Sequence, residues 1–185
     1  PRRPYVVVSN HQSFADIPFI SHLPWEMKWM AKEELFRLPF AGWMMRIAGD
    51  IPIKRGSLSS SKKALERARW YLDKNCSVII FPEGTRSPDG RVLRFSGGAF
   101  SLALNAGVPI LPLVIEGSSD CLPKDSWMFG EPRTVRLHVM PPIETDGIDP
   151  ADADDLRENV RDQIIDRLAD MQGVRPENVD AYARS

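Results

Sequence analysis

The sequence lacks any run of about 18 or more apolar residues, the length that a helix needs to cross a bilayer. It also lacks the charged, apolar and small-residue succession of a secretory signal peptide. Nothing in the given residues therefore predicts a membrane-spanning segment. Because the chain begins at Pro1 and an apolar strand follows almost at once, we expect that a preceding segment, such as an N-terminal membrane anchor, is missing from it.

Cysteine is scarce, and several motifs of catalysis and cofactor binding are missing. Cys76 and Cys121 form no metal or redox spacing. The sequence has no Gly-x-Ser-x-Gly nucleophile elbow, no glycine-rich dinucleotide loop and no P-loop. We therefore predict a protein that uses no metal and no cofactor, and whose activity does not depend on a serine elbow.

The composition that is present describes a globular protein. The chain has 185 residues, of which 43% are hydrophobic and 26% charged, enough for one domain with a sizeable core. Apolar strand patterns alternate with helical ones, without internal repeats or linkers, and this predicts a single α/β domain over residues 1–185 with a mixed, largely parallel sheet flanked by helices. Strands are expected at 5–8, 27–31, within 49–56, at 77–81, 108–115 and 134–140, and helices at 36–47, 57–74, 99–106 and from 150 onward. Residues 17–22 are expected to form a short helix or turn, and 123–132 a loop. Pro109 and Pro112 indicate an edge, a bulge or an irregular start for the strand at 108–115.

Charge is unevenly distributed along the chain. Residues 1–143 contain 19 Lys and Arg against 13 Asp and Glu, whereas residues 144–170 contain 3 against 10. A basic excess in the larger part favours an anionic substrate or an anionic lipid surface. Two solvated faces of opposite charge would explain the same numbers, and the sequence leaves both interpretations open.

The polar stretch 9–16 is the first candidate site. It follows the apolar strand at 5–8, so His11 is expected on a loop and Asp16 near the start of the next helix. A carboxylate five residues after a histidine can bind one ring nitrogen and leave the other free as a general base. The alternative is a helix-capping aspartate beside a histidine that serves only its own loop.

A second candidate site follows the buried strand at 77–81. There Gly84 lets the backbone approach a ligand, Thr85 offers a hydroxyl, and Arg86 offers a guanidinium that matches a phosphate. The cations Lys54 and Arg55 also follow a strand and can share its edge of the sheet. The alternative for Arg86 is an ion pair with Glu83.

The two sites together resemble the paired signatures of the glycerolipid acyltransferase family. Residues 10–16 (NHQSFAD, with His and Asp in HX4D spacing) and 81–86 (FPEGTR) carry the resemblance, and the nearest branch is the lysophosphatidic acid acyltransferases. Residues 49–55 and 108–112 are similar to two further blocks of the family, so the likeness covers about 5–117. The chain departs at Ser96, where many relatives have lysine, and at Lys54, where many have an acidic residue.

The resemblance implies a glycerol-3-phosphate acyltransferase-like fold and a role in phospholipid biosynthesis. An acyl group would pass from acyl-CoA or acyl carrier protein to the hydroxyl of lysophosphatidic acid, another lysolipid or a glycerol phosphate. His11 would be the general base and Asp16 its orienting partner. The acceptor phosphate would be held by Lys54, Arg55, Glu83, Gly84, Thr85 and Arg86. The expected partners are these substrates and a membrane surface, with no nucleic acid.

An apolar stripe in residues 36–47 is a candidate for contact with a membrane or an acyl chain. Its members, at helical spacing on one face, are Phe36, Phe40, Trp43, Met44 and Ile47, and Pro39 suits a first helical turn. Such a stripe is usually core, but it can also form an acyl-chain groove or lie on lipid. The resemblance favours the cytoplasmic face of a membrane, and the basic helix at 62–74 would support binding there.

Two other functions stay open at this stage. A serine esterase would use Ser13 or Ser96 with His11 and Asp16, although the missing elbow counts against it. A lipid-binding module without activity would keep the fold but would have no need of the intact histidine and aspartate.

Overall fold

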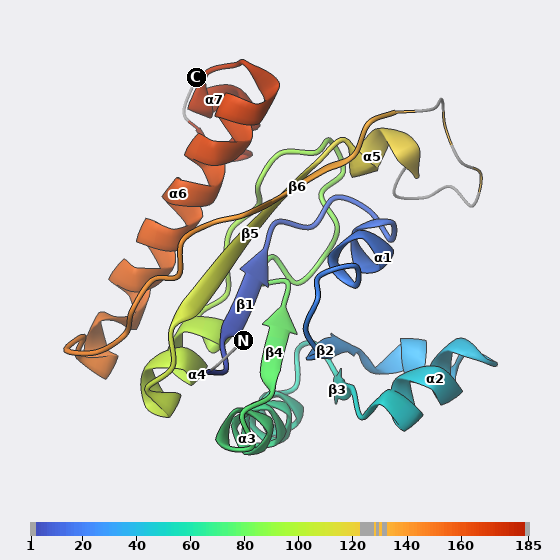
Figure 1. Ribbon diagram of the computed structural model, residues 1–185, viewed down its shortest axis with the longest axis vertical. Coiled ribbons are helices and arrows are strands. Elements are labelled where there is room, and N and C mark those ends of the chain that lie inside the picture. The colour runs from blue at the N-terminus through green and yellow to red at the C-terminus, as the bar shows by residue number, and fades with distance from the viewer. Residues whose placement is uncertain (1–2, 123–127, 129, 131–132, 184–185) are drawn as a thin grey trace.

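The computed structural model describes residues 3–122, 128, 130 and 133–183. Within them, six strands form one sheet; they are β1 (Val6–Ser9), β2 (Met27–Lys32), β3 (Ile51–Ile53), β4 (Ser77–Ile80), β5 (Ile110–Glu116) and β6 (Arg136–Val139). Their order is β3-β2-β4-β1-β5-β6 (Figure 1), with β1 to β5 parallel and β6 antiparallel to β5. The predicted mixed, largely parallel sheet is confirmed. Most of the loop expected at 123–132 lies outside the described residues.

The helices begin and end at residues suited to those positions. They are α1 (Asp16–Ile20), α2 (Ala41–Ala48), α3 (Leu58–Asp73), α4 (Gly98–Ala106), α5 (Ser118–Cys121), α6 (Ala153–Gln172) and α7 (Pro176–Val179), with 3-10 segments η1 (Glu33–Arg37) and η2 (Pro150–Asp152). The Ser57 hydroxyl caps α3 by accepting the N–H of Ser60, and the Asp149 carboxylate caps η2 through the N–H of Ala151. Gly107 ends α4 in the left-handed conformation, with φ 61°.

The sheet is buried on both faces, as continuous apolar strands predict. Val6 and Val8 of β1 point to the face covered by α3, α4 and α6, where they join the larger core. Val7 points to the other face and packs with Ile20 of α1. Because each fully buried valine or isoleucine contributes about 1.5–3 kcal/mol, this double burial holds the central strands, and the loops that leave them, in place.

Pro112 of β5 does not mark a sheet edge, which is one of the three interpretations of Pro109 and Pro112. β5 lies between β1 and β6, and Pro112 sits opposite Val8 of β1. The carbonyl of Pro112 accepts the N–H of Met140, just past the end of β6. The N–H and C=O of a strand residue point to the same side. The nitrogen of Pro112 therefore points toward the end of β6, so the absence of its N–H removes no hydrogen bond to β1.

The single helix predicted over residues 36–47 is wrong. The chain forms η1, breaks at Pro39 and Phe40, and restarts as α2; Phe40 has a φ of +61°, which a helix interior excludes. A Cβ on Gly42 would lie 2.2 Å from the carbonyl oxygen of Phe36, so glycine lets α2 begin against η1. Phe36 is therefore buried with η1, while α2 extends outward at one side of the molecule (Figure 1).

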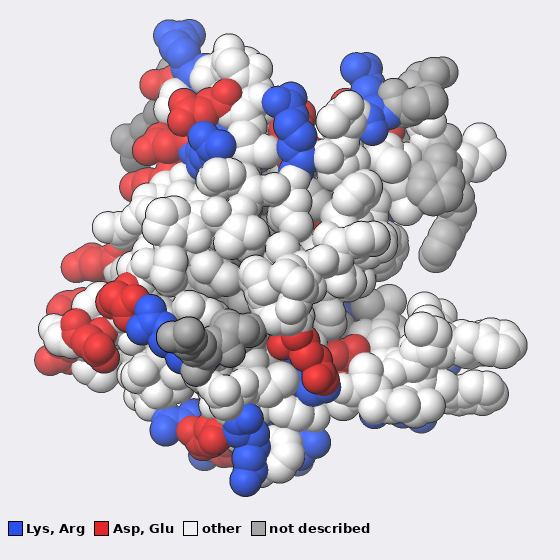
Figure 2. All heavy atoms as spheres, viewed as in Figure 1, with Lys and Arg blue, Asp and Glu red and all other residues white. Residues whose placement is uncertain are grey.

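The apolar side chains of α2 are on the surface, so a core role is wrong for this part of the stripe. The exposed fractions are 73% for Phe40, 61% for Trp43, 70% for Met44 and 87% for Ile47. Figure 2 shows the same region as a projecting, largely uncharged part of the surface. Among the described residues, no helix is both long enough and apolar enough to cross a membrane.

Candidate active site

The loop that leaves β1 brings His11 and Asp16 into contact. His11 Nδ1 lies 2.8 Å from Asp16 Oδ2, and the exposed fractions of the two side chains are 11% and 0%. Against an ionised carboxylate, Nδ1 carries the proton and donates it. The second ring nitrogen, Nε2, is then the basic one, so the pair has the arrangement of a general base with its orienting carboxylate.

Asp16 is fixed by the loop rather than by the helix that it begins. Its Oδ2 atom also accepts the backbone N–H groups of Gln12, at 2.8 Å, and Ser13, at 3.0 Å. The residue at the N-cap position of α1 is Ala15, which makes no side-chain cap. Asp16 Oδ1 is buried and accepts no hydrogen bond from the described residues. The alternative of a helix-capping aspartate is therefore wrong.

Phe81, the residue after β4, covers one face of the imidazole. The two rings are stacked with their centroids 3.9 Å apart and their planes 12° from parallel. β4 is the neighbour of β1 in the sheet, so the loop after β4 lies beside the His11 loop. The ring is thus held at its edge by Asp16 and on its face by Phe81.

Glu83 joins the two loops through backbone hydrogen bonds. Its Oε1 accepts the N–H of His11 at 2.8 Å, and its Oε2 accepts the N–H of Leu93 at 3.2 Å. Burial raises the pKa of Glu83 to about 8, although the two N–H groups act in the opposite direction. Both carboxylate oxygens are engaged with the backbone, which is a different role from the phosphate contact that the resemblance implied.

The loop after β4 continues with Gly84, Thr85 and Arg86 at the carboxyl edge of the sheet. Gly84 has a φ of +69° and its N–H closes a tight turn onto the carbonyl of Phe81, so the turn requires glycine. Thr85 is exposed. The Arg86 guanidinium carbon lies 4.1 Å from the centre of the Phe14 ring, which places a cation over the His11 loop.

Lys54 and Arg55 lie on the same edge of the sheet but farther along it. They follow β3, which is separated from β4 by one strand and from β1 by two. With about 4.8 Å between neighbouring strands, the end of β3 is roughly 10 Å from that of β4 and roughly 14 Å from that of β1. Both side chains are exposed, and partial burial lowers the pKa of Arg55. They can reach a substrate that extends from His11 toward β3.

The serine hydroxyls are engaged elsewhere. Ser13 Oγ donates to the carbonyl of Leu122 at 2.6 Å, and Ser96 Oγ donates to the carbonyl of Pro82 at 2.9 Å. Neither donor therefore points its proton at His11, which weakens the esterase interpretation. In the described part of the chain, no cluster of His, Cys, Asp and Glu side chains could hold a metal ion.

Two buried polar side chains of the loop were not predicted to have a role. Asn10 pairs with the backbone of Ile115, donating through Nδ2 and accepting through Oδ1, both at 2.9 Å. Gln12 donates to the carbonyl of Gly90 at 2.9 Å and is 2% exposed. These bonds tie the His11 loop to β5 and to the segment after β4. The only sequence signal was a polar run directly after a strand that is fully buried.

The fold and the site together define an α/β protein with a histidine–aspartate pair at the carboxyl edge of its sheet, next to a loop that carries arginine. The chain belongs to the Acyltransferase family, whose model matches residues 1–116. This confirms the family resemblance drawn from residues 10–16 and 81–86.

Several relatives extend the likeness beyond these residues. The chloroplastic 1-acyl-sn-glycerol-3-phosphate acyltransferase BAT2 of Brassica napus is 39% identical over 140 residues, covering 76% of this chain and 41% of that protein. The mouse enzyme 1-acyl-sn-glycerol-3-phosphate acyltransferase alpha is 38% identical over 167 residues, covering 89% and 59%. This chain thus spans about two fifths to three fifths of the length of these curated relatives.

A solved structure confirms the fold. The crystal structure of the 1-acyl-sn-glycerophosphate (LPA) acyltransferase PlsC from Thermotoga maritima matches with a TM-score of 0.81 and 34% sequence identity. The match covers 93% of this chain and 68% of that one, so it extends well beyond residues 1–116.

Proposed function

We propose that this protein transfers an acyl group from a thioester, acyl-CoA or acyl carrier protein, to the free hydroxyl of lysophosphatidic acid in phospholipid biosynthesis. The observation that carries the proposal is the contact of His11 Nδ1 with Asp16 at the end of β1, beside the Arg86 loop. The acceptor is proposed from the activities named for the relatives.

In the proposed reaction, the hydroxyl of the acceptor is the nucleophile. His11 Nε2 takes its proton as the oxygen attacks the thioester carbonyl, and Asp16 stabilises the imidazolium. The tetrahedral intermediate then expels the thiolate, which takes the proton back from His11. An ester bond forms, a thioester bond breaks, and no acyl-enzyme is needed. General-base help of this kind is worth roughly 10²–10⁴-fold in rate.

The acceptor phosphate is proposed to bind the loop after β4. The Arg86 guanidinium can hold two phosphate oxygens at once, and the Thr85 hydroxyl and the open backbone at Gly84 lie beside it. Lys54 and Arg55 would contribute positive charge from the end of β3. Glu83 would belong to the same site by holding the backbone of His11 rather than by touching the phosphate.

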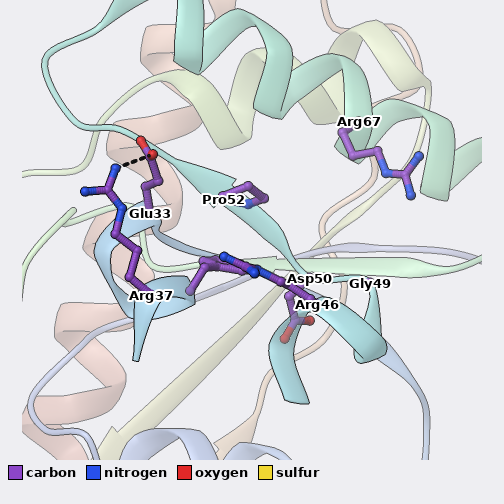
Figure 3. A pocket seen from close by; sticks show the side chains of 8 residues that line it. Glu33, Arg37, Arg46, Gly49, Asp50, Pro52 and Arg67 are labelled. Atoms are coloured by element: carbon purple, nitrogen blue, oxygen red, sulfur yellow. Dashed lines mark hydrogen bonds and ion pairs between the residues drawn. The ribbon is translucent and has the colours of Figure 1, made fainter. Parts of the chain in front are cut away.

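We further propose that α2 rests on the cytoplasmic face of a membrane, where both substrates meet. Its exposed side chains Trp43, Met44 and Ile47 suit the boundary between head groups and acyl chains. At the base of α2 lies a groove of about 350 Å³ (Figure 3), whose lining includes Arg37 and Arg46. These cations would face anionic head groups once α2 is inserted.

An acceptor comparison tests this function and separates it from the esterase. Purified protein is assayed with lysophosphatidic acid and with an uncharged monoacylglycerol, using each thioester donor in turn. Transfer to lysophosphatidic acid is expected to be far more efficient, and Ser13 and Ser96 should resist a serine-directed phosphonate. Hydrolysis of the donor without transfer, or equal efficiency on both acceptors, would contradict the proposal.

A further inference from the structure

Arg161 is a buried cation in the part of the chain that carries no family motif. It lies on α6, beyond the residues that the family model matches, and its side chain is only 8% exposed. Its neighbours on the helix, Val160 and Ile164, belong to the core. Burying a guanidinium is costly unless its donors are satisfied, so what it binds is informative.

The guanidinium binds the backbone of the segment after β4. Nε donates to the carbonyl of Leu93 at 2.9 Å, and Nη2 donates to the carbonyl of Val92 at 3.2 Å. Nη2 also forms an ion pair with Asp180, which balances the charge. Val92 in turn exchanges backbone hydrogen bonds with Val179 and Ala181, so the C-terminal segment and Arg161 hold the same peptide groups.

From Leu93 the hydrogen bonds continue to the base. The N–H of Leu93 donates to Glu83 Oε2 at 3.2 Å, and Glu83 Oε1 accepts the N–H of His11 at 2.8 Å. The positive charge of Arg161 also acts on this carboxylate, because it lowers the pKa of Glu83 against the effect of burial. Arg161, Leu93, Glu83 and His11 therefore form one connected path from α6 to the end of β1.

We propose that Arg161 is a positioning residue for His11, acting through Leu93 and Glu83. This inference rests on the proposed function, in which His11 must lie at a fixed distance from the acceptor hydroxyl. An error of about 1 Å in such a placement can cost about 100-fold in rate. In the proposed function the acceptor phosphate is held by Arg86, which is not part of this path, so substrate binding should depend on Arg161 much less than the chemical step does.

Two substitutions and a matched control test this role. Arg161→Met keeps the stem of the side chain but removes every donor, and Arg161→Lys keeps the charge but removes the planar fork. The control is Arg157→Met, one turn earlier on α6, where the arginine is 24% exposed and pairs with Asp154 and Glu158. For each variant of the intact chain, kcat, both KM values, the melting temperature and the hydrogen exchange of the His11 backbone amide are measured.

We expect Arg161→Met to lower kcat by about 10- to 100-fold while both KM values stay within about twofold. The His11 amide should exchange faster than in the control, and Arg161→Lys should fall between the two. A kcat equal to that of Arg157→Met, or a loss confined to KM, would overturn the role even if the melting temperature fell.

The exchange measurement keeps this inference separate from the proposed function. If His11→Ala kept full activity, the general-base mechanism would fail, but the exchange of the His11 amide in Arg161→Met would still test the path. Faster exchange there, with α6 amides protected as in the control, supports the path. Unchanged exchange at His11 overturns it.

Discussion

At the residue scale, Asp16 has two tasks, and one of them depends on its charge. Its Oδ2 accepts hydrogen bonds from His11 Nδ1 and from the backbone N–H groups of Gln12 and Ser13. Asp16→Asn keeps an oxygen for these contacts, with its NH2 group at the buried position of Oδ1, but removes the charge that stabilises the imidazolium. We expect kcat to fall by roughly 10²–10⁴-fold and both KM values to change little. Steady-state kinetics measure this split, and a change in KM alone would contradict it.

Glu83 gives the protein a pH-dependent stability that can be measured. Its pKa is about 8 in the folded protein and near 4.5 when unfolded, so between these values the folded state binds the extra proton. The contribution of Glu83 to the free energy of unfolding therefore falls as pH rises from about 4.5 to about 8, by up to a few kcal/mol.

Glu83→Gln removes this titration while keeping one acceptor for the N–H of His11. The melting temperature of the variant relative to the wild type is expected to rise with pH over this window and then level off. If the melting temperatures of the two proteins change with pH in parallel between about pH 5 and pH 9, the pKa of Glu83 is not raised in the folded protein.

Arg86 is expected to act on the acceptor alone. Arg86→Lys keeps the charge but loses the two-oxygen grip, so the KM for lysophosphatidic acid should rise markedly while the donor KM stays nearly constant. Arg86→Ala should cost more, about 2–4 kcal/mol in transition-state binding. Kinetics with both substrates varied give these values; an equal effect on an uncharged monoacylglycerol would remove Arg86 from the phosphate site.

The sequence could predict the contact between His11 and Asp16 because only five positions separate them. It could not predict that Glu83 binds the N–H of His11, because that bond depends on β4 lying beside β1, which spacing along the chain does not encode. Phe81 over the imidazole was missed for the same reason.

At the scale of elements, α2 is the test of membrane binding. Trp43→Ser removes an exposed aromatic side chain and should weaken flotation with anionic vesicles by about 10-fold. Tyr182→Ser is the control, because Tyr182 is also exposed, at 49%, but follows α7, which lies far from α2 in Figure 1. Equal flotation of the two variants would count against α2 as the docking element.

Elements could be predicted where periodicity and caps agree, as in α3 with Ser57 and α4 with Gly107. The prediction failed at residues 36–47 because Phe40 adopts a positive φ, which is uncommon for a phenylalanine and leaves no mark in the pattern. The strand at 108–115 was predicted correctly, but the edge interpretation of its prolines was wrong, because the cost of Pro112 depends on where β6 ends.

At the scale of the whole molecule, the sheet gathers the functional loops and α6 supports them from outside the motif region. The fold class followed from alternating strands and helices, but strand order did not, and it is strand order that sets the distance of Arg55 from His11. The contacts of the residues after 117 could not be predicted either, because Arg161 binds the backbone carbonyls of Val92 and Leu93, which any residues could supply.

The central claim is that His11 is the general base of acyl transfer. The most direct measurement is kcat for transfer to lysophosphatidic acid by His11→Ala, with the melting curve recorded on the same preparation. The account predicts a loss of at least roughly 10²-fold in a protein that still unfolds cooperatively, because His11 belongs to neither core cluster. The melting temperature should fall somewhat, because the contacts of the imidazole with Asp16 and Phe81 are lost. A kcat near that of the wild type, in a protein with a cooperative melting curve, would contradict the account.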